Sequence, residues 1–190
     1  MLVHLAPPVE PLADGVVILR PPSAADVEAI VRYCDQDQLE GWWLPISPGC
    51  APDLPGRVVE EWINGWAGQE SYNGPALLAE VEGAEGFVGV AGFCDRGQGV
   101  IEMTYGVAPK YRGQGLATRI VRLASPWALR DPSVITVELR IAADHFESQR
   151  VACKAGFRLS GTVTCTVNST GETLEDLCYV FSRDEEEPAS

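Results

Sequence analysis

The stretch Val107-Ala-Pro-Lys-Tyr-Arg-Gly-Gln-Gly-Leu-Ala-Thr-Arg119 has the pattern of a strand end, a short basic loop and the start of an amphipathic helix. Gly113 and Gly115 allow the backbone to come close to a ligand, and the first N–H groups of a helix have no partner within that helix. The helix dipole favours phosphate at the same end, and Arg112 adds a permanent charge with a bidentate fork. The stretch therefore predicts a site for an anionic ligand that carries phosphate.

Two common nucleotide-binding motifs fit this stretch poorly. A Walker loop needs Gly-Lys followed by Ser or Thr, and the sequence contains none. The dinucleotide fingerprint needs Gly or Ala where Thr118 stands, and it belongs to a parallel βαβ unit. Glu138 has about the right separation for a ribose contact, but it falls within an expected strand rather than at its end. An unrelated nucleotide-binding domain is therefore the weaker alternative.

The elements around this stretch follow the order β α α β β β α β α β β. Apolar and β-branched runs between Gly-rich turns predict the strands, and apolar residues at helical spacing predict the helices. No repeat or linker divides the chain, so we expect a single domain over 1–190, with a core of about 16–182 and a flexible tail at 183–190. The expected strands are 16–20, 76–81, 87–94, 100–107, 134–141, 157–167 and 173–182, and the expected helices are 24–37, 54–67, 113–129 and 144–155.

Composition restricts the partners of the chain. The 190 residues are 46% hydrophobic, enough for one domain to bury a core without a metal or disulfides. A net charge of -13 argues against nucleic-acid binding, which requires clustered Lys and Arg. From Lys110 to Arg158, however, nine basic residues oppose four acidic ones, a net of +5, which favours an anionic small ligand there. The acidic first half suits a cationic partner.

Cysteine, histidine and hydropathy patterns predict a metal-free protein of the cytoplasm. The six cysteines include no C-x-x-C pair, and the two histidines, His4 and His145, are far apart, so we expect reduced thiols and no metal site. No run of about 18 apolar residues exists to span a bilayer. The start of the chain lacks the basic and apolar regions of a secretory signal, so neither export nor membrane association is expected.

Two separate motifs resemble those of one enzyme superfamily. Arg112-x-x-Gly115-x-Ala117 after a strand resembles the R/Q-x-x-G-x-G/A signature of the GNAT acetyltransferases, and Ser148 to Phe157 resembles their second motif helix at the expected separation. Three further stretches resemble the Rim-type (ribosomal-protein N-terminal) acetyltransferases. These are Val17–Pro21 at the opening strand, Trp42–Pro45 in a tryptophan-bearing loop, and Ile101–Val107 in the strand before the signature.

The resemblance, which covers most of 16–182, implies the α/β (α+β) GNAT fold and a site for acetyl-CoA. In this fold a mixed, largely antiparallel sheet is flanked by helices, and the strands at 100–107 and 134–141 are parallel and splayed so that acetyl-CoA enters between them. The backbone from Arg112 to Ala117, called the signature loop below, would hold the pyrophosphate. The strand around Val107 would pair with the pantetheine and polarise the thioester carbonyl through a backbone N–H. The implied cofactor-binding residues are Tyr105, Gly106, Val107, Arg112, Gly113, Gln114, Gly115, Leu116, Ala117, Thr118, His145 and Ser148.

The catalytic residues are harder to assign. An amine attacks only when it is neutral, so a base should help, and Glu102 in an otherwise apolar strand is the candidate, with a solvent-facing strand residue as the alternative. The tyrosine that many GNAT enzymes use as an acid corresponds to Ala152 here. Ser148 is the candidate for relaying a proton to the leaving thiolate or bonding the sulfur. His145 stands where the family usually has asparagine.

These features predict an acetyl-CoA-dependent N-acetyltransferase that transfers the acetyl group to a primary amine by direct attack on the thioester. The acceptor would be a protein N-terminus or a small-molecule amine, and it would suit the acidic first half if cationic. A homodimer is also expected by analogy. The absent tyrosine and His145 leave an alternative of another class, a non-catalytic acyl-CoA-binding sensor or regulatory protein.

Overall fold

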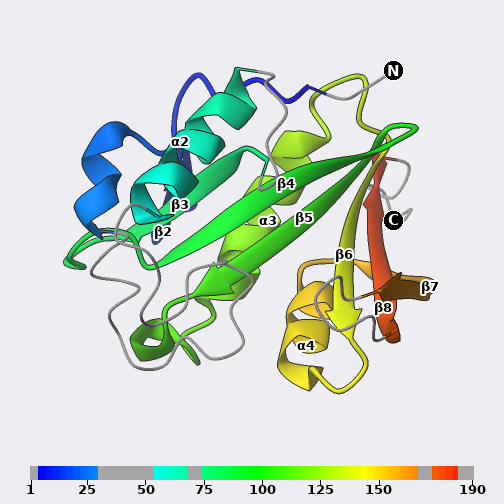
Figure 1. Cartoon of the computed structure of the whole chain (residues 1–190). Coiled ribbons are helices and arrows are strands. Elements are labelled where there is room, and N and C mark those ends of the chain that lie inside the picture. The colour runs from blue at the N-terminus through cyan, green and yellow to red at the C-terminus, as the bar shows by residue number, and fades with distance from the viewer. Residues whose placement is uncertain (1–3, 30–53, 68–73, 167–172, 184–190) are drawn as a thin grey trace, which may run out of the picture.

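The computed structural model describes residues 4–29, 54–67, 74–166 and 173–183. Its strands form one mixed eight-stranded sheet in the order β1-β2-β3-β4-β5-β6-β8-β7, in which β5 and β6 are parallel and the other described neighbours are antiparallel (Figure 1). The strands are β1 (Leu12–Ala13), β2 (Val17–Arg20), β3 (Ala76–Val81), β4 (Gly89–Gly97), β5 (Val100–Val107), β6 (Thr136–Ala142), β7 (Arg158–Thr166) and β8 (Thr173–Ser182). The helices are η1 (Ala24–Asp26), α2 (Leu54–Trp66), η2 (Pro109–Tyr111), α3 (Leu116–Ala128) and α4 (Phe146–Lys154).

Helices cover both faces of the sheet, and the side chains of β3 point alternately into the core on each face. Leu77 and Ala79 belong to the larger core cluster, which contains the buried face of α3. Leu78 belongs to a second cluster with Trp62 of α2, on the opposite face because successive strand residues point to opposite sides (Figure 1). Because α3 contributes its buried face to the larger cluster, this helix packs against the strands that lead into the signature loop.

The parallel pair β5·β6 is short, and this decides where a ligand can enter. Pairing runs only from Val100↔Thr136 to Glu102↔Glu138. Beyond that point β5 continues along β4 as far as Val107, whereas β6 continues along β8 as far as Ala142. The two strands therefore separate in the middle of the sheet (Figure 1), as the resemblance implied.

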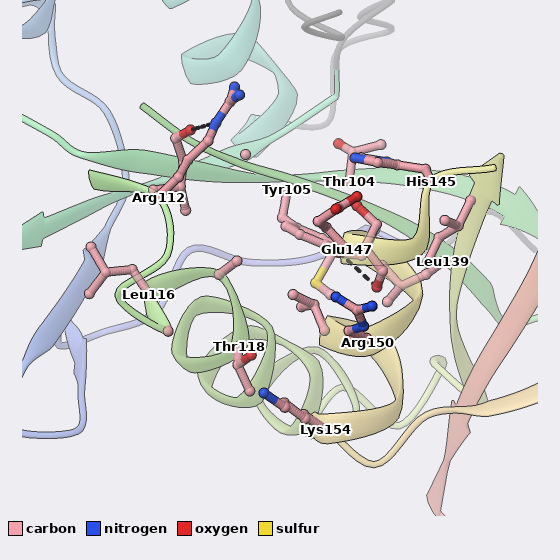
Figure 2. Close-up of a pocket in the computed structure, with 18 of the residues that line it drawn as sticks. Thr104, Tyr105, Arg112, Leu116, Thr118, Leu139, His145, Glu147, Arg150 and Lys154 are labelled. Carbon is pink, nitrogen blue, oxygen red and sulfur yellow. Dashed lines mark hydrogen bonds between the residues drawn. The ribbon is translucent and has the colours of Figure 1, made fainter. Parts of the chain in front are cut away.

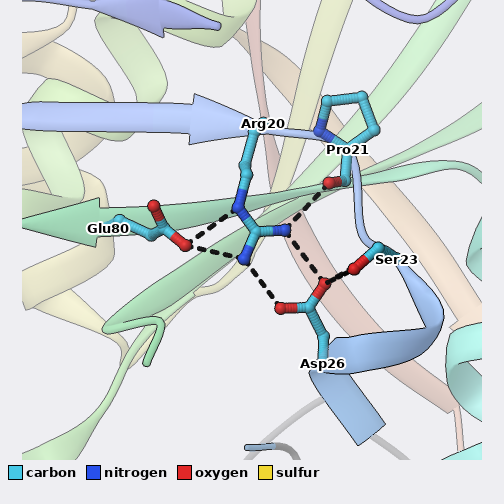
Figure 3. Close-up of polar contacts among 5 residues, drawn as sticks. All are labelled: Arg20, Pro21, Ser23, Asp26 and Glu80. Atoms are coloured by element: carbon cyan, nitrogen blue, oxygen red, sulfur yellow. Dashed lines mark hydrogen bonds and ion pairs between the residues drawn. The ribbon is translucent and has the colours of Figure 1, made fainter. Parts of the chain in front are cut away.

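A partly buried ion-pair cluster joins β2, β3 and η1 (Figure 3). Arg20 donates from Nε to Glu80 at 2.8 Å and from Nη2 to Asp26 at 2.7 Å, and the Ser23 N–H donates to Asp26 at 2.7 Å. Burial acts to raise the pKa of Asp26, but the hydrogen bonds from Arg20 and Ser23 outweigh it and hold the pKa below its usual value. The cluster fixes the start of the helical segment over the sheet.

Several boundaries differ from the sequence predictions. Helix α3 begins at Leu116 rather than at 113, because Gly113 and Gly115 have φ values of 75° and 77° and form a left-handed loop before it. Strand β4 begins at Gly89 rather than 87, and the two-residue β1 was not predicted. Of the helix expected at 24–37, helical backbone is seen from 24 to 29. The remainder of that helix, the loop at 42–45 and the tail at 184–190 lie outside the described residues.

In the described part of the chain no helix is long and apolar enough to cross a membrane. Among the cysteine side chains that the structure describes, Cys94, Cys153 and Cys178 are free thiols.

Candidate cofactor-binding site

A pocket of about 820 Å³ lies where β5 and β6 separate, and α3 and α4 form its other walls (Figure 2). It contains eleven of the predicted site residues and omits Gln114 and Glu102. The predicted residues that line it are Tyr105, Gly106, Val107, Arg112, Gly113, Gly115, Leu116, Ala117, Thr118, His145 and Ser148.

The signature loop offers backbone N–H groups to a ligand. Gly115 is the N-cap of α3 and, having no side chain, leaves the first turn uncapped. A Cβ at Gly113 or Gly115 would meet no atom within 4 Å, so the space beside both residues is open. Because the first turn of α3 contains no acidic residue, the positive end of its dipole is not neutralised there. The loop fits a phosphate group.

Arg112 lies at the edge of this loop. Its Nε donates to the carbonyl of Val107 at 3.0 Å, which ties the loop back to the end of β5. Gln114 instead bonds the Lys110 carbonyl, at 3.5 Å, outside the pocket. The predicted loop residues therefore divide into those that face the pocket and Gln114, which does not.

In the described residues, the backbone of β5 beyond Glu102 has no strand partner on the side from which β6 has departed. The Ala108 N–H donates to the carbonyl oxygen of Val88 at 2.8 Å, on the side of β4. Since N–H groups alternate in direction along a strand, the N–H of Val107 is directed to the other side, into the gap. A donor fixed in this way can pair with an extended ligand or polarise a carbonyl group.

Tyr105 and Ser148 connect the two sides of the pocket. The Tyr105 hydroxyl donates to the Ser148 carbonyl at 3.3 Å. Burial raises the pKa of Tyr105, and the hydrogen bond to Ser148 opposes this only in part, so the phenol is a neutral donor at physiological pH. His145 is the N-cap residue of α4 and lies near Thr104 in Figure 2.

Ala152, at the position of the family tyrosine, faces the core rather than the pocket. Its exposed fraction is 0%, and it packs in the larger core cluster. The helix therefore presents no phenol from this position, and the Tyr105 hydroxyl of β5 instead reaches α4 at the Ser148 carbonyl.

Glu102 lies on β5 outside the pocket, at the last residue pair before the strands separate. It is 9% exposed, and its carboxylate accepts from Arg96 Nε at 2.7 Å and pairs with Arg140 Nε at 3.2 Å. Arg140 Nε also pairs with Glu138 at 2.6 Å. Both arginines contact the same oxygen of Glu102, Oε2, and a proton on this carboxylate would weaken both ion pairs. The structure thus separates Glu102 from the other predicted site residues.

Sequence reasoning missed the cationic and acidic residues on the far wall, Arg140 from β6 and Glu147, Arg150 and Lys154 from α4. The excess of basic residues between Lys110 and Arg158 was the available signal. It did not identify individual residues, because charge alone does not distinguish a pocket wall from a solvated surface.

The sequence model of the acetyltransferase (GNAT) domain matches residues 17–158. The chain belongs to the GNAT acetyltransferase family. The predicted GNAT family and its fold with a parallel pair of strands are thereby confirmed, and the protein is an acyltransferase by family.

Solved GNAT structures superpose on nearly the whole chain. A putative ribosomal-protein-serine acetyltransferase from Vibrio cholerae has a TM-score of 0.74 at 14% identity, over 94% of this chain and 99% of its own. RimJ of Mycobacterium smegmatis in complex with CoA-disulfide has a TM-score of 0.70 at 24% identity, over 98% of this chain and 93% of its own. An aminoglycoside acetyltransferase in complex with coenzyme A has a TM-score of 0.67 at 23% identity, over 88% of this chain and 95% of its own. Comparison with curated proteins gives no match.

Across the described residues of this GNAT domain, no group of three or more His, Cys, Asp and Glu side chains is arranged to hold a metal ion.

Proposed function

We propose that the protein transfers the acetyl group of acetyl-CoA to a primary amine by direct attack of the amine on the thioester. The observation that carries the proposal is the gap between β5 and β6, where the Val107 N–H faces the same pocket as the Gly113–Gly115 loop. The Gly113–Gly115 loop thus offers hydrogen-bond donors to phosphate, and β5 offers a hydrogen-bond donor near the reacting carbonyl.

Acetyl-CoA supplies an acyl group that is already activated as a thioester. In this proposal the backbone from Arg112 to Ala117 holds the pyrophosphate, and the N–H groups on the open side of β5 hold the pantetheine. Val107 then stabilises the charge that develops on the thioester oxygen, an effect of about 3–4 kcal/mol where a comparable donor has been removed.

The acceptor must present a neutral amine. An α-amine has a pKa of about 8 and a lysine amine about 10.4, so both are mainly protonated at neutral pH. We keep Glu102 as the candidate base, and because it does not line the pocket it would act through water. Ser148 is proposed to relay a proton to the leaving thiolate or to bond the sulfur, and His145 to contact the pantetheine arm.

Two classes of acceptor suit this chemistry, the N-terminus of a protein and a small-molecule amine. The names of the similar structures include a ribosomal-protein-serine acetyltransferase and an aminoglycoside acetyltransferase, one for each class. The net charge of -13 supports a cationic acceptor in either class by electrostatic steering. A homodimer in the cytoplasm is the expected setting, and sedimentation of the purified protein tests the oligomeric state.

Calorimetric titration tests the proposal. Purified protein is titrated with acetyl-CoA, ATP and NAD, and the series is repeated on Arg112→Glu, with Arg130→Glu at the far end of α3 as the matched control. Selective binding of acetyl-CoA that Arg112→Glu weakens and Arg130→Glu does not supports the site, and an amine screen follows. A folded protein that does not bind acetyl-CoA contradicts the proposal. Binding without turnover of any amine would indicate the sensor instead.

A further inference from the structure

Helix α4 presents two cationic side chains to the pocket. Arg150 and Lys154 are four residues apart, which places them on one face of the helix, and both line the pocket. Figure 2 shows the Lys154 side chain directed toward the first turn of α3, where Thr118 lies. We call Arg150, Lys154 and Thr118 the cationic corner of the pocket; Lys154 faces the first turn of α3, and Arg150 lies one turn earlier on α4.

A link between the two helices fixes the position of this corner. Arg122 of α3 donates from Nε to the carbonyl of Lys154 at 3.1 Å and donates to the same oxygen from Nη2. The guanidinium therefore caps the C-terminus of α4, where a cation is favourable. The main chain at Lys154 is therefore held against α3, and the Lys154 side chain starts beside that helix.

Neither Arg150 nor Lys154 forms an ion pair or a side-chain hydrogen bond with the described part of the chain. The other two cations of the pocket are already engaged, Arg140 with Glu102 and Glu138, and Arg112 with the Val107 carbonyl. Like charges four residues apart destabilise a helix. Two unpaired cations facing a pocket, in a protein of net charge -13, are explained by an anionic ligand group between them.

The chemistry of coenzyme A supplies such a group apart from its pyrophosphate. The ribose carries a 3′-phosphate, a monoester with a charge between -1 and -2 near neutral pH, by analogy with phosphorylated side chains. The signature loop offers backbone N–H groups, and the cationic corner offers full charges and the Thr118 hydroxyl. We propose that Arg150, Lys154 and Thr118 hold the ribose 3′-phosphate, and that the protein thereby selects coenzyme A over its 3′-dephospho form. This inference rests on the proposed function of the same pocket.

Titration with two ligands that differ only in this phosphate tests the inference. Acetyl-CoA and acetyl-3′-dephospho-CoA are titrated calorimetrically into wild-type protein, Lys154→Ala, Arg150→Ala, Thr118→Val and, as control, Arg130→Ala. Arg130 is exposed at the end of α3 and does not line the pocket. We expect wild-type protein and the control to bind acetyl-CoA at least about 10-fold more tightly than the dephospho ligand. Lys154→Ala should lose most of that ratio while binding the dephospho ligand as wild-type protein does.

Each outcome has one meaning. Equal affinity of wild-type protein for the two ligands overturns the inference but leaves the proposed function standing. If Lys154→Ala and Arg150→Ala weaken both ligands by the same factor, the cations act on the pyrophosphate and the inference is also wrong. If wild-type protein binds neither ligand, the proposed function itself fails. Because both side chains are exposed, thermal unfolding of each variant should match wild-type protein and so exclude misfolding as the cause.

Discussion

The hydroxyl of Tyr105 and the backbone carbonyl of Ser148 are joined by a 3.3 Å hydrogen bond that crosses the pocket from β5 to α4. It is a contact of the phenol with the main chain of α4, so it positions the whole helix turn rather than one side chain. The walls that would enclose the pantetheine are therefore connected before any ligand is bound.

We expect Tyr105→Phe to weaken acetyl-CoA binding about 3- to 10-fold. The change preserves packing and removes one hydrogen bond, typically worth about 0.5–1.5 kcal/mol. Titration calorimetry measures the effect. Tyr111→Phe is the matched control, because Tyr111 lines the same pocket and its hydroxyl has no partner in the described residues. Equal affinities for Tyr105→Phe and wild-type protein would show that the link does not shape the pocket.

If Glu102 is the base, Glu102→Gln should lower kcat by at least about 100-fold and leave acetyl-CoA affinity nearly unchanged. Glu138→Gln is the control, since Glu138 pairs with the same Arg140 but was not predicted to take part in proton transfer. Steady-state rates across pH, with calorimetry for binding, separate the two roles. An unchanged rate in Glu102→Gln excludes the base, and equal losses in both variants indicate that the network is structural.

Gly89→Ala should destabilise the sheet beside the pocket. A Cβ at this position would lie 2.4 Å from the carbonyl oxygen of Gly106 and 3.0 Å from Ile120, so the backbones of β4 and β5 must move apart. We expect a loss of about 1–3 kcal/mol in urea unfolding. In Gly56→Ala the added Cβ meets nothing within 4 Å in helix α2, and this variant should be slightly more stable than wild-type protein. A Gly89→Ala protein as stable as wild type would show that the close approach is not required.

The Arg20–Asp26 pair predicts a pH dependence of stability. Because the pKa of Asp26 in the folded protein is below the ordinary value of 3.8, its contribution is full above that value and is lost as pH falls through the folded pKa. Asp26→Asn should cost about 1–2 kcal/mol at neutral pH and converge with wild-type protein in acid. Urea unfolding between neutral and acidic pH measures both curves. Glu80→Gln is the control, because it changes the more exposed partner of Arg20 and should keep the acid dependence of stability. Parallel curves of unfolding free energy against pH for Asp26→Asn and wild-type protein would refute the assignment.

Local patterns predicted the elements well where turn residues mark their ends. Strand β5 was predicted at its observed bounds, because glycines and a proline bracket an apolar run. The start of α3 was predicted three residues early, since helical periodicity does not reveal that Gly113 and Gly115 adopt left-handed backbone. The parallel pairing of β5 with β6 came from the family resemblance, because pairing between distant segments leaves no local signal.

The site was predicted unevenly for a related reason. The signature loop and the end of β5 are continuous in sequence, so one motif located most of the residues that face the pocket. Glu102 is close in sequence but faces Arg96 and Arg140, because alternation along β5 and the onset of strand separation decide which residues reach the gap. Arg150 and Lys154 join the site only through the packing of α4 against α3, which no local pattern encodes.

The early separation of β5 and β6 gives the sheet an inner margin with unsatisfied backbone groups, in addition to its two outer margins. In the free protein the Val107 amide has no partner among the described strands on this margin, so its hydrogen exchange should be faster than that of amides paired between neighbouring strands. A ligand that pairs with this margin would slow exchange and add RT ln(1 + [L]/Kd) to the unfolding free energy. Resistance to proteolysis would then rise with the acetyl-CoA level, which would link the lifetime of the protein to the supply of its proposed substrate.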